Sequence, residues 1–402
     1  MTHENERKQD EKGKTEHLEN YDVEQAIAVV RELGEGLIEA TKHVKHHFRR
    51  EWLEQLTDHY RVRPGKPIIH LDDLDDKVIP HLSSEACELL RPYWTQLVKG
   101  HGSEWGSEHF RCVWDIMSGK GTPRWWSSLR VWRKFGELTS MRVNELEPYV
   151  VALRAASTGT SRVILRPKLP FNLATPAGAK VIGYRGDATY DTSAFNNKDE
   201  TLHEDYKRAV TALVGETPFT SYLRESDGYK RTSVGVLVTI LTTIGGIDNT
   251  VRQKWALNPL PSWFFVLERD SVLAGIRALY DAEGSPTSRG VKLSQAVGVS
   301  ELPTKLTLPP AKSLGLRVSK LEPQLLDQLH QRPPPLLTST ALLLHQFGVT
   351  SFLSLEKVWK TKRDFTAFWL LTIYRMRMMK RYRDIVGFTS TKKSTNLAKF
   401  TA

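Results

Sequence analysis

Two acidic residues, Asp187 and Glu283, each close a run of apolar and small residues. An α-helix has 3.6 residues per turn, so residues three or four apart lie on one face. Each run then carries a stripe of small side chains, at Ala179, Gly183 and Gly186 in the first and at Ala274, Ala278 and Ala282 in the second. Small stripes allow two helices to pack closely, which would bring the two carboxylates together where the helices end.

Two carboxylates in one place repel each other unless a cation lies between them. Mg²⁺ (or Mn²⁺) fits such a pair, because it prefers oxygen ligands and keeps waters while it bridges phosphates. The ion activates water and neutralises charge on the phosphate, which is the chemistry of phosphodiester hydrolysis. We therefore predict that Asp187 and Glu283 are metal ligands and catalytic residues of a hydrolase.

The composition limits the class of protein further. The chain has 402 residues and a formal net charge of +11, with an isoelectric point near 9.4, which favours a polyanionic partner such as nucleic acid. Two cysteines, Cys87 and Cys112, exclude a disulfide scaffold and a cysteine-rich zinc module. The longest apolar run, near 234–247, is too short to cross a bilayer, and the polar N-terminus resembles no targeting peptide. We expect a soluble cytoplasmic protein with no membrane partner.

The chain divides into segments that differ in composition and in the periodicity of their apolar residues. Residues 1–20 predict a disordered tail, and residues 21–155 predict a mostly helical domain in which helix begins near Asp22. From about residue 160, short β-prone pieces alternate with helices, and the small-residue helix ending in an acid occurs twice. This imperfect internal repeat predicts two similar halves about a pseudo-twofold axis.

Residues 110–139 allow two interpretations. A turn at 118–122 between two helices is typical of a helix-turn-helix, in which arginines contact DNA, here Arg124, Arg130 and Arg133. In the other interpretation the tryptophans anchor a core and the arginines face solvent. The sequence leaves both open.

The two acidic helices also carry a resemblance. LAGIRALYDAEGS (273–285) resembles the signature helix of the LAGLIDADG homing endonucleases, and AKVIGYRGDAT (179–189) resembles the other signature helix of that family. Flanking segments follow in the family's order, namely FNNKDETLHEDYKRAVTALVG (195–215), NPLPSWFF (258–265), VKLSQ (291–295) and RYRDIVGFTSTKKSTNL (381–397). The resemblance covers roughly residues 160–402.

The resemblance implies an α+β fold, with a pseudo-twofold core of two αββαββα-like halves at 160–265 and 266–402. Their saddle-shaped antiparallel sheets would lie along the major groove of double-stranded DNA and contact base edges there. Each half would supply one acid and cut one strand, leaving short 3′ overhangs. The implied protein is a monomeric, intron- or intein-associated endonuclease that makes site-specific double-strand breaks.

Family members often place a lysine from each half near the scissile phosphate, where it stabilises negative charge. Lys254 is the matching residue of the first half, and Lys392 or Lys393 that of the second, with Lys393 taken as the catalytic candidate. Ala188 stands where the family has glycine. Arg185 and Arg277 lie within the signature helices, where they neutralise the acids, contact phosphate or face solvent.

The alternative function is binding of nucleic acid without cleavage, by a protein with the same fold. A LAGLIDADG core that has lost catalysis would act as a DNA-binding transcription regulator, or as an intron maturase that binds intron RNA. A DNA-binding N-terminal domain and Ala188 favour this alternative, whereas the presence of both acids favours cleavage.

Overall fold

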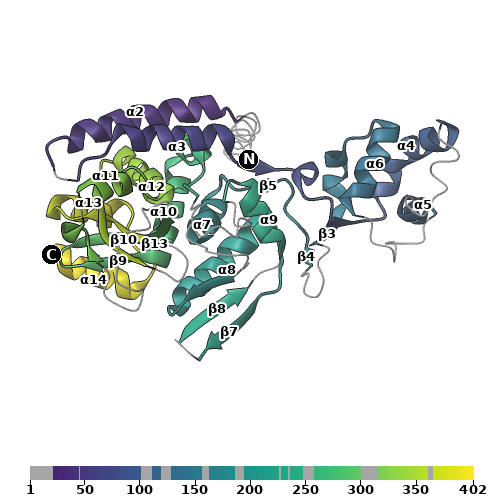
Figure 1. Cartoon of the computed structure of the whole chain (residues 1–402). Coiled ribbons are helices and arrows are strands. Elements are labelled where there is room, and N and C mark those ends of the chain that lie inside the picture. Colours follow the sequence, from purple (N-terminus) through teal and green to yellow (C-terminus); the bar gives the residue numbers. More distant parts are fainter. Residues whose placement is uncertain are drawn as a thin grey trace, which may run out of the picture.

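The computed structural model describes most of residues 21–402. Outside the described residues lie the N-terminal twenty residues, expected as a tail, and the internal positions 45, 101–110, 119–127, 156–162, 186–193, 226–227, 234–235, 248–257, 300–315, 322 and 361–364. The described chain mixes helices with small antiparallel sheets (Figure 1). Among these helices, none combines the length and the apolar composition that a bilayer crossing requires.

A helical hairpin begins the described chain and lies across the top of the larger body in Figure 1. Its helices are α2 (Val23–Thr41) and α3 (Arg50–Val62). The helical segment expected to begin near Asp22 is interrupted, and the Thr41 side chain accepts a hydrogen bond from the Phe48 amide across the connection. The hairpin is tied to distant segments, since the indole of Trp52 donates to the His330 carbonyl at 2.7 Å and the Tyr60 hydroxyl to the Leu260 carbonyl at 2.8 Å.

His59, in the second helix of this hairpin, makes the free energy of unfolding depend on pH. Burial, assisted by the Arg63 guanidinium, lowers the pKa of His59 from 6.5 to about 4. Between these pH values the unfolded chain binds more protons than the folded one, so stability falls as the pH falls through this window. Allowing for solvent screening, we expect a loss of about 2 kcal/mol. Urea unfolding at pH 7 and pH 4 measures this loss of stability. If a His59→Gln variant shows the same pH dependence as the wild type, His59 is not its cause.

A smaller module projects to the right in Figure 1 and is joined to the larger body by the two-stranded pairing of β1 (Ile68–Ile69) with β5 (Phe171–Asn172). It consists of a three-stranded antiparallel sheet with helices beside it. The strands are β2 (Val78–Leu82), β3 (Val150–Ala155) and β4 (Ile164–Leu165), and the helices are α4 (Ala86–Gly100), α5 (Arg111–Met117), α6 (Leu129–Thr139), η1 (Leu71–Asp73) and η3 (Val143–Tyr149).

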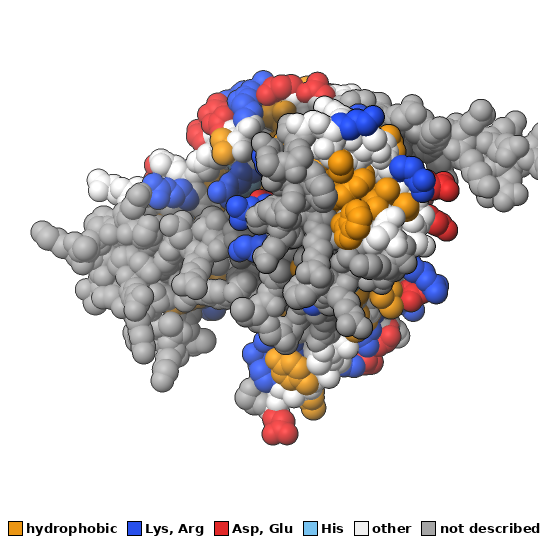
Figure 2. Space-filling view, turned by 90° about the vertical axis from the view of Figure 1, so that its right-hand side faces the viewer, with side chains coloured by type: hydrophobic (Ala, Val, Ile, Leu, Met, Phe, Trp, Pro, Cys, Tyr) orange, Lys and Arg blue, Asp and Glu red, His pale blue; other side chains and the backbone are white. Residues whose placement is uncertain are grey.

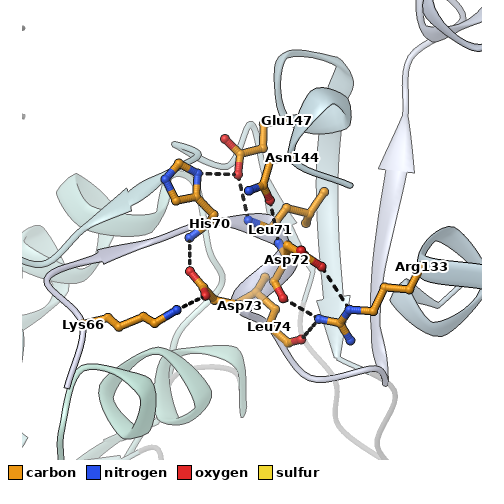
Figure 3. A network of polar contacts seen from close by, with 9 residues as sticks. All are labelled: Lys66, His70, Leu71, Asp72, Asp73, Leu74, Arg133, Asn144 and Glu147. Carbon is orange, nitrogen blue, oxygen red and sulfur yellow. Dashed lines mark hydrogen bonds and ion pairs between the residues drawn. The ribbon is translucent and has the colours of Figure 1, made fainter. Parts of the chain in front are cut away.

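Arg133 of α6 is part of a polar network at the base of this module (Figure 3). It forms ion pairs with Asp72 and Asp76 and donates to the carbonyls of Asp72 and Leu74. Arg133 is therefore held within the module by these contacts. Of the turn expected at 118–122 in a helix-turn-helix, residues 119–122 lie outside the described residues.

The first stretch of the larger body contains a three-stranded antiparallel sheet in the order β6–β8–β7. Asp199 caps the helix beside this sheet, because its carboxylate accepts a hydrogen bond from the Thr201 amide. The elements in chain order are α7 (Pro176–Arg185), β6 (Ala194–Asn197), α8 (Glu200–Val214), β7 (Thr220–Arg224), β8 (Tyr229–Ser233) and α9 (Val236–Ile244).

The second stretch contains a five-stranded antiparallel sheet in the order β11–β12–β13–β10–β9. Its inner face is mostly apolar, with Leu293, Trp369 and Leu371 buried on it together with the polar Gln295. The elements are η4 (Ser262–Val266), α10 (Arg269–Glu283), β9 (Gly284–Thr287), β10 (Gly290–Val299), β11 (Leu316–Arg317), η5 (Val318–Lys320), α11 (Pro323–His330), α12 (Pro335–Gln346), β12 (Phe352–Lys360), β13 (Phe365–Ile373), α13 (Met376–Ile385) and α14 (Thr391–Thr401).

Candidate functional site

The two helices that carry the sequence signatures, α7 and α10, approach each other closely at Gly183 and Gly275. A Cβ atom added to Gly183 would lie 2.1 Å from the Gly275 carbonyl oxygen and 3.1 Å from the Ala278 Cβ. A Cβ on Gly275 would lie 3.0 Å from the Ala179 carbonyl oxygen. Gly275 is thus close to Ala179 and Gly183, whereas Ala278, further along α10, is close to Gly183. The contacting residues follow the same order along both helices. The helices run parallel and end on the same side.

Glu283 is the last residue of α10, and its side chain is exposed on that side of the molecule. Its predicted partner Asp187 follows the end of α7 at Arg185 by two positions and lies outside the described residues, as does Lys254. The structure therefore places one of the two predicted acids. The helix pair that was expected to bring them together is present.

Lys393 of α14 reaches the end of α10. Its ammonium group donates to the main-chain carbonyls of Tyr280 and Asp281, at 3.1 and 2.5 Å. Burial lowers the pKa of Lys393, and the carboxylates of Asp281, Glu283 and Asp199 oppose this shift. A cation at a helix C-terminus is stabilised by the free carbonyls there. Lys393 thus holds positive charge beside Glu283.

Asp281 joins α10 to the start of α14. Its buried carboxylate accepts hydrogen bonds from the Thr389 amide at 2.9 Å and from the Ser390 amide at 3.1 Å. Burial raises the pKa of Asp281, while these amides oppose the shift. Ser390 in turn caps α14 and donates to Asp199, the cap of α8. One chain of contacts therefore fixes two helix starts to the end of α10.

Replacing Asp281 by alanine is expected to lower the free energy of unfolding by about 2 kcal/mol. The change leaves the amides of Thr389 and Ser390 without their acceptor, which costs more than is regained by removing a buried charge. Urea unfolding measures the difference. Asp281→Asn keeps one carbonyl oxygen as acceptor, so its free energy of unfolding should fall by about half as much. Equal stability of the wild type and the alanine variant would contradict this role of Asp281.

A cavity of about 610 Å³ opens beside this network, between the starts of α8 and α14 and the strand β9. Three lysines line it, Lys198, Lys392 and Lys393, and Lys392 is exposed. Two carboxylates also line it, but Asp199 accepts from Ser390 and Thr201, and Glu200 forms an ion pair with Lys230. The other lining residues are Asn197, Ser285, Pro286, Ser390, Thr391 and Asn396. The cavity reaches to within two residues of Glu283 along the chain.

Of the two arginines of the signature helices, Arg185 is buried and Arg277 is half-buried. Arg185 is 2% exposed, and its guanidinium lies 3.5 Å from the Thr239 hydroxyl of α9 and also interacts with Tyr206 of α8. Arg277 donates to the Val386 carbonyl at 2.5 Å. Both arginines therefore hold neighbouring helices against α7 and α10.

The positioning network of Asp199, Asp281 and Ser390 was not predicted from the sequence. One signal was visible, because Asn-x-Asp at 197–199 is typical of a helix start. Nothing local to the sequence shows that Asp199 meets Ser390, since 191 positions separate them.

Comparison with known proteins gives only distant structural likeness. No family model and no curated protein matches the sequence. Among solved structures, the chain is similar to mesophilic variants of the homing endonuclease I-DmoI, with 13% identity and a TM-score of 0.29 over 54% of this chain and 97% of that chain. I-DmoI with DNA and Mn gives 12% identity and a TM-score of 0.30 over 54% and 98%, and I-DmoI with DNA and Ca gives 12% and 0.27 over 53% and 90%. At these TM-scores the likeness carries no weight for the site, and the function proposed next rests on the chain's own residues.

Proposed function

We propose that the chain is a divalent-metal-dependent, site-specific endonuclease of double-stranded DNA, built on a pseudo-twofold LAGLIDADG core. The observation that carries the proposal is the parallel contact of α7 with α10, whose shared end bears an exposed carboxylate, Glu283, and a lysine, Lys393. A carboxylate that can hold a metal ion and an ammonium group that adds positive charge, both at the end of a close helix pair, suit phosphodiester hydrolysis.

Glu283 offers one oxygen ligand for a hard divalent cation, and the described residues contain no cluster of three or more His, Cys, Asp or Glu side chains that could hold one. Glu283 is an exposed carboxylate that follows a helix held rigidly by Asp281 and Lys393, and oxygen donors are what Mg²⁺ and Mn²⁺ prefer. Asp187 is proposed as the second carboxylate ligand, from the other half. When bound, the ion would activate water and offset charge on the scissile phosphate.

Lys393 acts on the same phosphate through its position. Its carbonyl contacts keep the ammonium group at the end of α10, so that it adds positive charge where the phosphate gains negative charge. Lys254 is proposed to do the same in the first half. The β6–β8–β7 sheet and the five-stranded sheet are proposed to lie along the duplex, with one chain sufficient for an asymmetric site.

The proposal is tested by cleavage of a randomised duplex library by the full chain, with Mg²⁺ and with a chelator, followed by sequencing of the ends. Breaks with short 3′ overhangs at one recurring site, present only with Mg²⁺, are the expected result. Equal cleavage with chelator, or no cleavage with either, would overturn it.

A second candidate is a binding protein on the same fold, either a transcription regulator or a maturase of intron RNA. Ala188 favours it, because family members have glycine after this acid and alanine resists a backbone with positive φ. Retention of particular duplexes or transcripts by the chain, without breaks in Mg²⁺, would distinguish this candidate from the nuclease.

A further inference from the structure

Lys393 is held more firmly than an ordinary surface lysine. Figure 2 shows Lys and Arg side chains at the surface of one face of the molecule. Lys393, by contrast, is half-buried, and its ammonium group donates to the carbonyls of Tyr280 and Asp281 at the end of α10. Because Lys393 lies in the first turn of α14, the place of its ammonium group depends on how the start of that helix is fixed.

The two ends of α14 are fixed by different kinds of contact. Near its C-terminal end Leu397 and Thr401 are buried, and the Arg383 guanidinium donates to the Thr401 hydroxyl at 2.9 Å. The start of α14 borders the cavity of about 610 Å³ instead, and the residues that line this cavity are polar except for Pro286. Polar contacts therefore fix the start of the helix, and its cap, Ser390, is the residue that makes them.

Ser390 is joined to both stretches of the larger body. Its amide donates to Asp281 of the second stretch at 3.1 Å, and its hydroxyl donates to one carboxylate oxygen of Asp199 in the first stretch. The other oxygen of Asp199 accepts from the Thr201 amide at 3.0 Å, so this carboxylate is itself held at the start of α8. Asp199 thus gives the first stretch a hold on the helix that carries Lys393.

The charge of Asp199 also acts on Lys393. Burial lowers the pKa of Lys393, and the carboxylates of Asp281, Glu283 and Asp199 oppose this shift. Asp281 and Glu283 belong to α10, whereas Asp199 caps α8 in the first stretch. The Asp199 carboxylate is therefore near enough to the ammonium group to help keep it charged.

We propose that Asp199 is a positioning residue for Lys393: by holding Ser390 it fixes the start of α14, and with it the ammonium group beside the end of α10. The effect expected on cleavage rests on the proposed function, in which Lys393 adds positive charge at the phosphate of one DNA strand. A residue of the first stretch then sets the geometry of a group that acts in the second. Breaking this contact should slow the cut that Lys393 serves and spare the other.

Asp199→Ser tests the contact without removing the cap of α8. Serine is about as favourable a cap as aspartate, but its single short hydroxyl cannot serve both the Thr201 amide and Ser390. The full chain, without DNA, is labelled with an amine-reactive ester, and the rate at each lysine is followed by fragment-ion mass spectrometry. We expect Lys393 to be labelled about fivefold faster in Asp199→Ser than in the wild type, because its ammonium group leaves the carbonyls more often. Lys392 is already exposed and serves as the internal reference.

Glu204→Gln is the matched control, because Glu204 is an exposed acid of the same helix whose ion pair is with Lys207. It removes the same charge and should leave the labelling of Lys393 at the wild-type rate. The double variant Asp199→Ser, Ser390→Ala tests the route: if Asp199 acts through Ser390, this variant labels Lys393 no faster than Ser390→Ala alone. Effects that multiply in the double variant, or an unchanged rate in Asp199→Ser, would overturn the proposal.

Cleavage of the recurring library site in Mg²⁺, with each strand labelled, measures the functional consequence. We expect Asp199→Ser to cut one strand about tenfold more slowly and the other at nearly the wild-type rate, so that nicked duplex accumulates. A loss of stability alone would lower both rates together, so equal slowing of the two strands contradicts a positioning role. If the wild type makes no Mg²⁺-dependent cuts while the labelling of Lys393 responds as expected, the proposed nuclease fails and the positioning role stands.

Discussion

Replacing Glu283 by glutamine is expected to reduce Mg²⁺-dependent duplex cleavage by about a thousandfold or more, with little change in duplex binding. Glutamine keeps the size of the side chain and removes the charge that would hold a divalent cation. A thousandfold loss corresponds to about 4 kcal/mol at the transition state, which matches the several kcal/mol that a metal ion supplies there. Glu283 is exposed where α10 ends, and its replacement by glutamine leaves the hydrogen bonds between Asp281 and the start of α14 in place.

Cleavage of the recurring library site under single-turnover conditions measures this effect, and mobility shift in chelator measures binding. Asp270→Asn is the control, because it removes the same charge from an exposed residue in the first turn of the same helix. It should cleave at nearly the wild-type rate. If Glu283→Gln cleaves as fast as Asp270→Asn, Glu283 has no part in catalysis. Asp187→Asn should behave as Glu283→Gln does, if both acids hold the metal.

Structural features that depend only on residues close together in the sequence could be predicted well. The spacing of Ala274, Ala278 and Ala282 predicts a helix with a small-residue face, and α10 ends at Glu283. The segment VKLSQ lies in β10, directly after the signature helix and β9. These features depend on residues close together in the chain, where periodicity and turn chemistry act directly.

Features that depend on distant residues could not be predicted. The ion pairs of Arg133 cannot be read from its own segment, because the acids that hold it, Asp72 and Asp76, lie about sixty positions earlier. Trp52 is likewise joined to His330 across 278 positions. Local patterns report which side chains are polar or apolar, but they do not report which distant group satisfies them.

The faces of the β6–β8–β7 sheet were also missed. TSYLR and YKRTS are short, and both alternate aromatic, basic and hydroxyl residues without a clear apolar period. Strand register is weakly specified by such a pattern. Pairing of Ser221 with Thr232 decides which residues face out, and that pairing becomes visible only in the structure.

Gly183→Ala is expected to destabilise the protein by about 3 kcal/mol. The new methyl group would lie 2.1 Å from the Gly275 carbonyl oxygen, so α7 and α10 must move apart along their contact. Overpacking of this kind costs roughly 1–3 kcal/mol, more when backbone opposes it, and the helix preference of alanine offsets at most about 1 kcal/mol. Urea unfolding measures the result. Gly100→Ala is the control, because an added Cβ there meets nothing within 4 Å and should not destabilise α4.

Gly275→Ala distinguishes a backbone clash from a side-chain clash in the same contact. Its nearest obstacle is the Phe264 ring at 2.5 Å, which can shift, whereas the Ala179 carbonyl oxygen stands at 3.0 Å. A smaller loss than for Gly183→Ala is therefore expected. Because Glu283 lies where this helix pair ends, separation of the helices should also move it relative to the other half. Cleavage should then fall in the order of the stability losses, measured where each variant remains folded. Full cleavage by a folded but destabilised Gly183→Ala would show that the helix contact does not position the acid.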